Sequence, residues 1–171
     1  VAQLGMLALS GAEPKELMDQ AVRQIAYTLN ADYCKVLQYR PEQPDFLLVS
    51  GVGWQEGAVG NVAVDAGQHS QAGFTLLSND AVIVKDLRTE KRFSGPELLI
   101  EHQVVSGISC LINNSNPPFG VLGVHTKDSR NFTRDDANFL LAVANMLSTA
   151  LKMKENQRVL SETNKRLDMA R

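Results

Sequence analysis

The chain has 171 residues, of which 44% are hydrophobic and 21% are charged, and its formal net charge is −2. These values are typical of one globular domain with short extensions, large enough to bury a core without metals or disulfides. The small net charge gives no reason to expect nucleic-acid binding. No apolar run approaches the ~18 residues that a membrane span requires.

The first residues of the chain and its two cysteines indicate the cellular compartment of the protein. The chain begins at Val1 and lacks the basic segment that opens a secretory signal. Cys34 and Cys110 each lie in an apolar, strand-like run, which predicts two buried, reduced thiols. We therefore expect a cytoplasmic fragment of a longer protein.

The first third of the chain predicts helices followed by a hairpin. Residues 1–12 are expected to end a helix that enters from an upstream segment. Apolar residues at helical spacing predict a helix over Pro14–Leu29, with Asn30 as its stop. Tyr33–Arg40 and Asp45–Gly51 alternate as two strands joined by a turn. In the first strand one face carries Cys34, Val36 and Gln38, and the other carries Tyr33, Lys35, Leu37 and Tyr39.

The middle of the chain is rich in turn-forming residues, and glycine is frequent from Gly51 to Gly73. A second hairpin is expected around the turn at Asn113–Pro118. The predicted elements are strands at Asn61–Val64, Ala81–Val84, Ser106–Asn113 and Phe119–Thr126, and short helices at Ser70–Leu77 and Glu97–His102.

The last predicted element is a helix from Arg134 to the end of the chain. Thr133 is the expected N-cap, and Asp136 forms a variant of the capping box with it. The apolar residues that follow alternate at spacings of four and three, which is typical of a coiled-coil seam. A solitary helix is marginal in water, so we expect this seam to pair with a second copy of the chain. The seam consists of Phe139, Val143, Met146, Ala150, Met153, Leu160 and Leu167, with Gln157 and Asn164 as polar members.

The order of elements and four motifs resemble a GAF domain over Glu13–Lys154. The motifs are Leu98–Gly107, Pro118–His125, Arg130–Asp136 and Phe139–Leu140. The resemblance implies an α+β fold with a central antiparallel sheet of about six strands. The terminal helices would cover one face, and loops and short helices would form a pocket on the other. The implied division is residues 1–12 as a connecting helix, 13–154 as the sensory domain, and 155–171 as a signalling helix that leads to an effector.

GAF-type pockets bind cyclic nucleotides, bilins, haem, small metabolites or nothing, so the resemblance leaves the cofactor unknown. Bilin-binding members attach their chromophore to a Cys just before a His. Ser94–His102 holds no Cys, so covalent bilin attachment is not expected. Phosphodiesterase members carry an Asn-Lys…Phe…Asp-Glu signature. Asn131, Phe132, Asp135 and Asp136 echo it, but no Lys follows Asn131, and a helix start explains these residues better.

The resemblance places several residues in the expected pocket. His125 fits a pocket wall and plain sheet packing equally well. His102 is interpreted as a helix-end cation rather than a haem ligand. The expected pocket residues are Trp54, Phe74, Arg92, Phe93, Leu98, His102, Ser109, Leu111 and His125.

A group of basic residues and the three histidines are further candidates for binding sites. Arg88, Lys91 and Arg92 form a basic loop cluster that could hold an anion, although solvated loop charge is the commoner explanation. The three histidines, which include His69, lack the spacing of metal ligands, so no metal site is expected.

The sequence therefore predicts a sensory module of a bacterial signalling protein, such as a histidine kinase, that relays a signal through a dimeric helical bundle. The chain lacks phosphate-binding and nucleophile-elbow motifs, so we expect no catalysis by the chain itself. One alternative is a structural dimerisation module without a ligand. Another is a methionine-sulfoxide reductase of GAF type, which two cysteines in strand cores do not favour.

Overall fold

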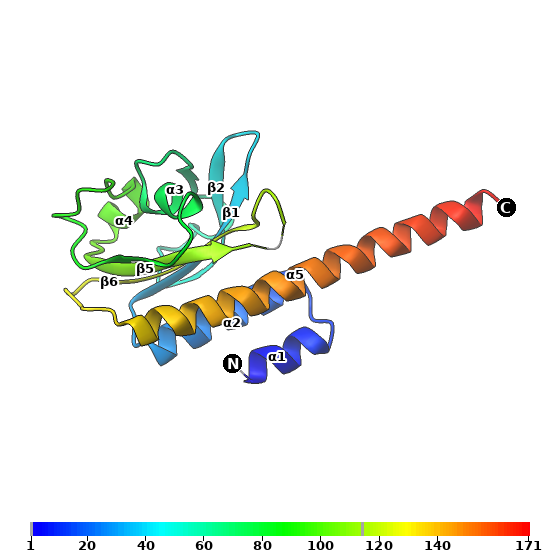
Figure 1. Ribbon diagram of the computed structural model, residues 1–171, viewed down its shortest axis with the longest axis horizontal. Helices are drawn as coiled ribbons and strands as arrows, with labels where there is room; N and C mark the ends of the chain where they lie inside the picture. The colour runs from blue at the N-terminus through cyan, green and yellow to red at the C-terminus, as the bar shows by residue number, and fades with distance from the viewer. Residues whose placement is uncertain (1, 114) are drawn as a thin grey trace.

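A six-stranded antiparallel sheet separates two layers of the protein (Figure 1). The computed structural model describes residues 2–113 and 115–171, so Val1 and Asn114, which belong to two of the predicted segments, lie outside the described part. The strand order is β3-β2-β1-β6-β5-β4, with β1 and β6 at the centre. The elements are α1 (Ala2–Leu9), α2 (Pro14–Thr28), β1 (Tyr33–Arg40), β2 (Asp45–Val52), β3 (Ala63–Asp65), α3 (Gln71–Leu76), β4 (Val82–Val84), α4 (Glu97–Glu101), β5 (Ser106–Ile112), β6 (Gly120–Thr126) and α5 (Arg134–Met169).

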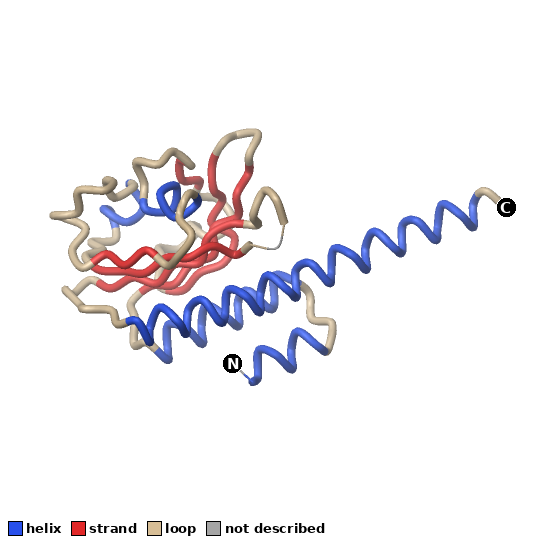
Figure 2. Tube along the Cα trace, in the orientation of Figure 1, coloured by secondary structure: helices blue, strands red, loops and turns tan. Residues whose placement is uncertain are grey.

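The predicted α+β architecture is confirmed. Figure 2 shows α2 and α5 together along one face of the sheet, with α3, α4 and the crossover loops on the other. Most predicted boundaries agree with the structure to within one or two residues. The strand expected at Asn61–Val64 is shifted to β3, because the amides of Asn61 and Val62 donate to the Ala58 carbonyl and close a turn there.

The main core lies between the sheet and the helix layer, and it follows from the alternation of the strands. Even-numbered residues of β1, β5 and β6 point toward α2 and α5, where burial of apolar side chains stabilises the fold. The strand residues of this core are Cys34, Val36, Ile108, Cys110, Ile112, Leu122 and Val124. The helix residues that pack on them include Leu17, Val22, Ile25, Leu140, Val143, Ala144 and Leu147.

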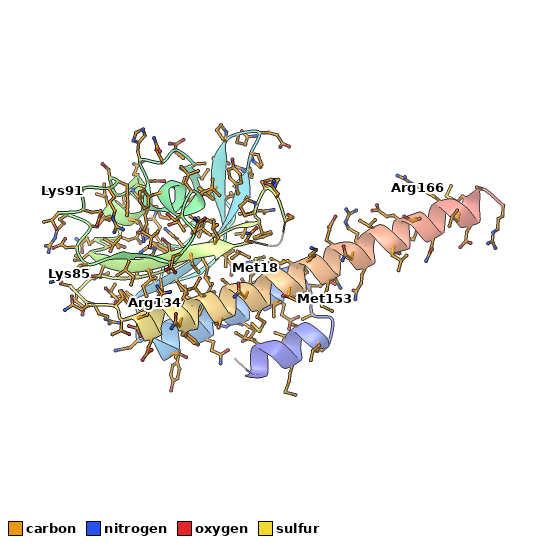
Figure 3. The ribbon with its side chains drawn as sticks, in the orientation of Figure 1. Met18, Lys85, Lys91, Arg134, Met153 and Arg166 are labelled. Atoms are coloured by element: carbon orange, nitrogen blue, oxygen red, sulfur yellow. The ribbon has the colours of Figure 1, made fainter. Side chains whose placement is uncertain are left out.

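Helix α5 has two different halves (Figure 3), and Met153 lies near the point where they meet. Its buried positions run from Ala137 to Leu151, and every residue from Glu155 onward is exposed. The predicted partner seam is therefore wrong at Val143, which is fully buried against the sheet. Phe139, Met146 and Ala150 also pack partly on this core. A core-facing helix stripe and a heptad seam have nearly the same spacing, so the sequence does not separate them.

Helix α1 lies against α2 and α5, antiparallel to α2 in Figure 1. Leu4 is buried in the same core as the helix layer. The chain reverses after α1 at Gly11, whose φ of 80° lies in the left-handed region that favours glycine. The segment expected to be a connecting helix thus packs on the domain in this structure.

The start of α5 is fixed by the capping box that the sequence predicts. The Asp136 amide donates to the Thr133 hydroxyl at 3.1 Å, and the Thr133 amide donates to the Asp136 carboxylate at 2.9 Å. We expect Thr133→Ala to lower the free energy of unfolding by about 1 kcal/mol, because an N-cap side chain is lost. Urea denaturation measures this change.

Thr149→Ala is the matched control, since Thr149 lies exposed in the middle of the same helix. Alanine is the better helix former there, so this control should be neutral or slightly stabilising. Equal losses in both variants would show that the capping box does not stabilise the start of α5.

Candidate functional site

The face of the sheet opposite α2 and α5 carries two polar side chains on its central strands, Lys35 of β1 and His125 of β6. Lys35 lies opposite Gly123, and His125 lies opposite Gly107. A Cβ atom at Gly107 would collide with His125 Nδ1, and one at Gly123 would lie 3.1 Å from Lys35 Cε and 3.0 Å from His125 Nε2. Glycine at these two positions therefore gives room for the Lys35 stem and the imidazole to lie side by side.

Lys35 is only 2% exposed, and within the described residues its ammonium has no hydrogen bond or ion pair. Burial without a counter-charge lowers the pKa of Lys35 from 10.5 to about 7. The Nζ atom lies 5.7 Å from the centroid of the Trp54 ring, a cation–π contact that offsets part of this desolvation.

His125 is fully buried, and neither ring nitrogen has a hydrogen-bond partner within the described residues. Burial, and then the neighbouring Lys35, lower the pKa of His125 well below its usual range. The imidazole is therefore neutral at physiological pH, with one N–H to donate and one nitrogen to accept. A native core seldom leaves both nitrogens of a buried imidazole without a partner, and here a lysine without a counter-charge lies beside it. This combination marks the face as a candidate site.

Trp54, from the crossover after β2, covers the two polar groups. Its ring stacks on Tyr33 with centroids 4.6 Å apart, and its Nε1 donates to the Cys34 carbonyl at 2.9 Å. Its ring centroid lies 6.1 Å from that of His125 and 5.0 Å from that of His102. The aromatic pair of Tyr33 and Trp54 thus forms a fixed apolar wall beside Lys35 and His125.

His102 secures this cover and is not itself a free ligand. Its Nδ1 donates to the Leu98 carbonyl at 2.8 Å, because a carbonyl can only accept. Its Nε2 accepts a hydrogen bond from the Gln55 amide at 3.0 Å. His102 is the residue that ends α4, as interpreted, and both of its ring nitrogens are occupied by the protein. The Tyr33 hydroxyl donates to the His102 carbonyl at 3.0 Å and ties the same corner to β1.

A second group of polar residues on this face forms hydrogen bonds within the group. Gln71 Nε2 donates to the Ser109 hydroxyl at 3.1 Å, and the Thr75 hydroxyl donates to the backbone carbonyl of Gln71 at 2.7 Å. The Ser109 and Thr75 hydroxyls are 2.6 Å apart, so Ser109 donates the bond between them. All three side chains are buried. This closed cycle fixes α3 to β5.

The family of the chain follows from its sequence match over most of this fold. The GAF domain model matches residues 13–151. The chain belongs to the GAF domain family. No match to the sequence was found among curated proteins.

Solved GAF domains share the fold. The chain is similar to the GAF domain of a phosphoenolpyruvate-protein phosphotransferase from Coxiella burnetii, with a TM-score of 0.81, 14% identity, and coverage of 92% of this chain and 94% of that one. It is also similar to residues 122 to 287 of a methyl-accepting chemotaxis protein, with a TM-score of 0.76, 14% identity, and coverage of 90% and 98%. A phycoerythrobilin-bound GAF domain from a cyanobacterial phytochrome gives a TM-score of 0.74, 13% identity, and coverage of 92% and 95%.

The single pocket expected from the sequence divides into separate groups in this GAF domain. Trp54 contacts His102, His125 and Lys35, and Ser109 lies in the closed polar cycle. Leu98 and Leu111 belong to the apolar cluster on this face, packed with residues such as Leu37, Phe46, Leu48, Val64 and Val121. Leu98 also lines a groove of about 540 Å³ between β3 and α4.

Phe74, Arg92 and Phe93 form a group of their own at the β4 edge of the sheet. The rings of Phe74 and Phe93 lie 5.2 Å apart, and the Arg92 guanidinium lies 5.6 and 5.4 Å from their centroids. Arg92 is paired with Glu90 at 2.5 Å and donates to the Ile83 carbonyl at 2.7 Å. Nε and Nη2 of Arg92 therefore bond to protein groups at this edge.

Metal and thiol chemistry find little support in the GAF domain. Across residues 2–113 and 115–171, no group of three or more His, Cys, Asp or Glu side chains could hold a metal ion. Cys34 and Cys110 are free, buried thiols, as predicted, and burial raises the pKa of both, that of Cys110 to about 12. Over the same residues, no helix combines the length and apolar character needed to cross a membrane.

Lys35 was not among the residues that the sequence predicted for the site. The sequence did place Lys35 on the same face as Tyr33 and Leu37. The available signal was a charged residue between apolar neighbours in a strand whose two faces are both apolar. Such a strand is central, and a lysine within it is rare unless it has a role.

The lowered pKa of Lys35 predicts a pH dependence of stability. Between about pH 7 and 10.5 the unfolded chain keeps a proton on Lys35 that the folded chain has lost, so the free energy of unfolding rises with pH. The rise is up to about 1.4 kcal/mol per pH unit for one group. We expect this slope between pH 7 and 8.5, and we expect Lys35→Met to lack it.

Urea denaturation of both proteins at several pH values in this range measures the difference between their slopes. The cysteine thiols titrate at higher pH and His125 at lower pH, and both are shared by the two proteins. Parallel curves for the two proteins would show that Lys35 titrates normally when folded.

Proposed function

We propose that this GAF domain senses a small molecule at the sheet face of Lys35 and His125 and relays the signal through α5 in a homodimer. It would act within a cytoplasmic signalling protein of a bacterium, such as a histidine kinase, without catalysing a reaction itself. The proposal has two parts, a binding site on one face of the sheet and a relay on the other.

The observation that carries the proposal is the continuity of α5. One helix runs from the sheet core at Ala137–Leu151 into a fully exposed tail. Helix α5 packs on β5, which pairs with β6 of the site, and on α2, which packs on β1. In β1, Lys35 alternates with Cys34 and Val36, which pack in the helix layer. His125 likewise follows Val124, which packs in the same layer. A shift of β1 or β6 on binding would therefore move α2 and β5, against which α5 packs.

The tail supports a paired state. Met153, Leu160 and Leu167 recur every seven residues and are 47%, 62% and 57% exposed. Exposed apolar residues at heptad spacing favour a parallel partner helix. Arg158 pairs with Glu155 and Glu162 along the helix, which stabilises the exposed tail as a helix.

The similar structures support a signalling context. The neighbours named above come from a phosphotransferase, a chemotaxis protein and a phytochrome, and the phytochrome domain is bound to phycoerythrobilin. A sensory domain that is connected to an effector by a helix is consistent with these similar structures. The buried thiols on the helix side of the sheet speak against a reductase.

Native mass spectrometry tests both parts of the proposal in one experiment. We expect the unmodified chain to be a dimer with a small molecule bound to each protomer. Leu160→Asp combined with Leu167→Asp should raise the dimer dissociation constant by about tenfold or more. Each unpaired charge buried in the interface is unfavourable by on the order of 1–3 kcal/mol.

Val159→Asp is the matched control, since Val159 is exposed on the same helix but lies off the seam. This control should remain a dimer. A monomer at every concentration of the unmodified chain would contradict the relay. A dimer without any bound molecule would contradict sensing and favour a structural dimerisation module.

A further inference from the structure

The two unpartnered polar side chains of the site differ from every other polar group around them. The hydroxyl and amide donors of Ser109, Thr75 and Gln71 bond to one another. The two nitrogens of His102 bond to backbone groups. Lys35 and His125 are 2% and 0% exposed and, among the described residues, have no such partners. The donors that remain to recognise a ligand are therefore an ammonium and an imidazole.

This donor set suits one kind of chemical group. A buried ammonium is unfavourable without an anion beside it, and an anion that binds there compensates the buried charge. The Lys35 ammonium offers donors to one oxygen, and the neighbouring imidazole N–H of His125 can reach a second. Two oxygens that accept and carry one negative charge are those of a carboxylate.

A phosphate fits less well. Phosphate sites favour the planar, five-donor guanidinium of Arg or a cluster of backbone amides. The arginines of the nearby loops are already paired, Arg88 with Asp86 and Arg92 with Glu90. The site also has an apolar wall in the stacked rings of Tyr33 and Trp54, against which the carbon part of a small organic acid would pack.

We propose that Lys35 and His125 form a subsite for the carboxylate group of a small organic acid. The proposal rests on the sensory function proposed above and names the class of molecule that is sensed. Trp54 covers the subsite and, through Nε1, is bonded to the backbone of β1. An acid that displaces Trp54 would pull on β1, on which α2 packs, and α2 in turn packs against α5. This connects the ligand class to the relay.

Acetate, the smallest group with the proposed head, is the probe. We expect acetate to raise the melting temperature of the unmodified chain at constant ionic strength, and acetamide, which has the same size but no charge, to have no effect. Lys35→Met should weaken acetate binding by about tenfold or more, the loss typical of a charge-assisted hydrogen bond. Lys91→Met, the same substitution at an exposed loop lysine, should respond as the unmodified chain does.

A second readout does not depend on a variant that folds. In NMR spectra of the unmodified chain, acetate should shift the ring resonances of His125 and leave those of the exposed His69 unchanged. An equal acetate effect in Lys35→Met and Lys91→Met, or no shift at His125, would overturn the carboxylate assignment. Failure with acetate combined with a neutral molecule bound in native mass spectrometry would overturn this assignment alone and leave sensing intact.

Discussion

The alternation of side chains along β1 is the constraint on which the rest of this protein depends. β1 lies at the centre of the sheet between β2 and β6, so both of its faces are covered. Its even-numbered residues Cys34 and Val36 build the helix-side core, and its odd-numbered residues Tyr33 and Lys35 build the site. A shift of one residue in the pairing of β1 would exchange these roles and destroy both layers. The core and the site are thus two consequences of one register.

The site is a place where the fold keeps an unfavourable arrangement. Other buried polar side chains on this face are paired with one another in the described part of the chain, as in the cycle of Gln71, Thr75 and Ser109. At Lys35 the sheet removes a charge from water and supplies only an aromatic face. Violations of ordinary packing rules of this kind concentrate at functional sites. The glycines that flank the site, Gly107 and Gly123, fit this view, because any side chain there would push the polar groups apart.

Much of the fold could be predicted from the sequence, because local rules decide it. The capping box at Thr133, the stop at Asn30 with its φ of 48°, and the two faces of β1 all follow from neighbours in the chain. The sequence prediction was less accurate for α5, because the same spacing of apolar residues is typical of a core stripe and of a partner seam. Val143 belongs to the core stripe, and Leu160 is exposed on the second half of the helix. The two kinds of position differ only in whether the sheet lies beside them.

The site was harder to predict because it depends on long-range register. Lys35 and His125 are brought together by the pairing of β1 with β6, and no local pattern records which residues become opposite. The path of the crossover likewise decides that Trp54 covers the site, whereas Phe74 and Phe93 pack with Arg92 at the β4 edge. Family resemblance singled out Trp54 and His125 but not the lysine that lies beside them.

Titration of the Lys35 side chain by NMR tests the account most directly. Lysine labelled with ¹³C at the ε position reports the protonation of each ammonium, and the resonance lost in Lys35→Met identifies Lys35. The account predicts a midpoint near pH 7, because the ammonium is buried without a counter-charge. A midpoint near the ordinary lysine pKa of about 10.4 would show a solvated or paired ammonium and contradict the account.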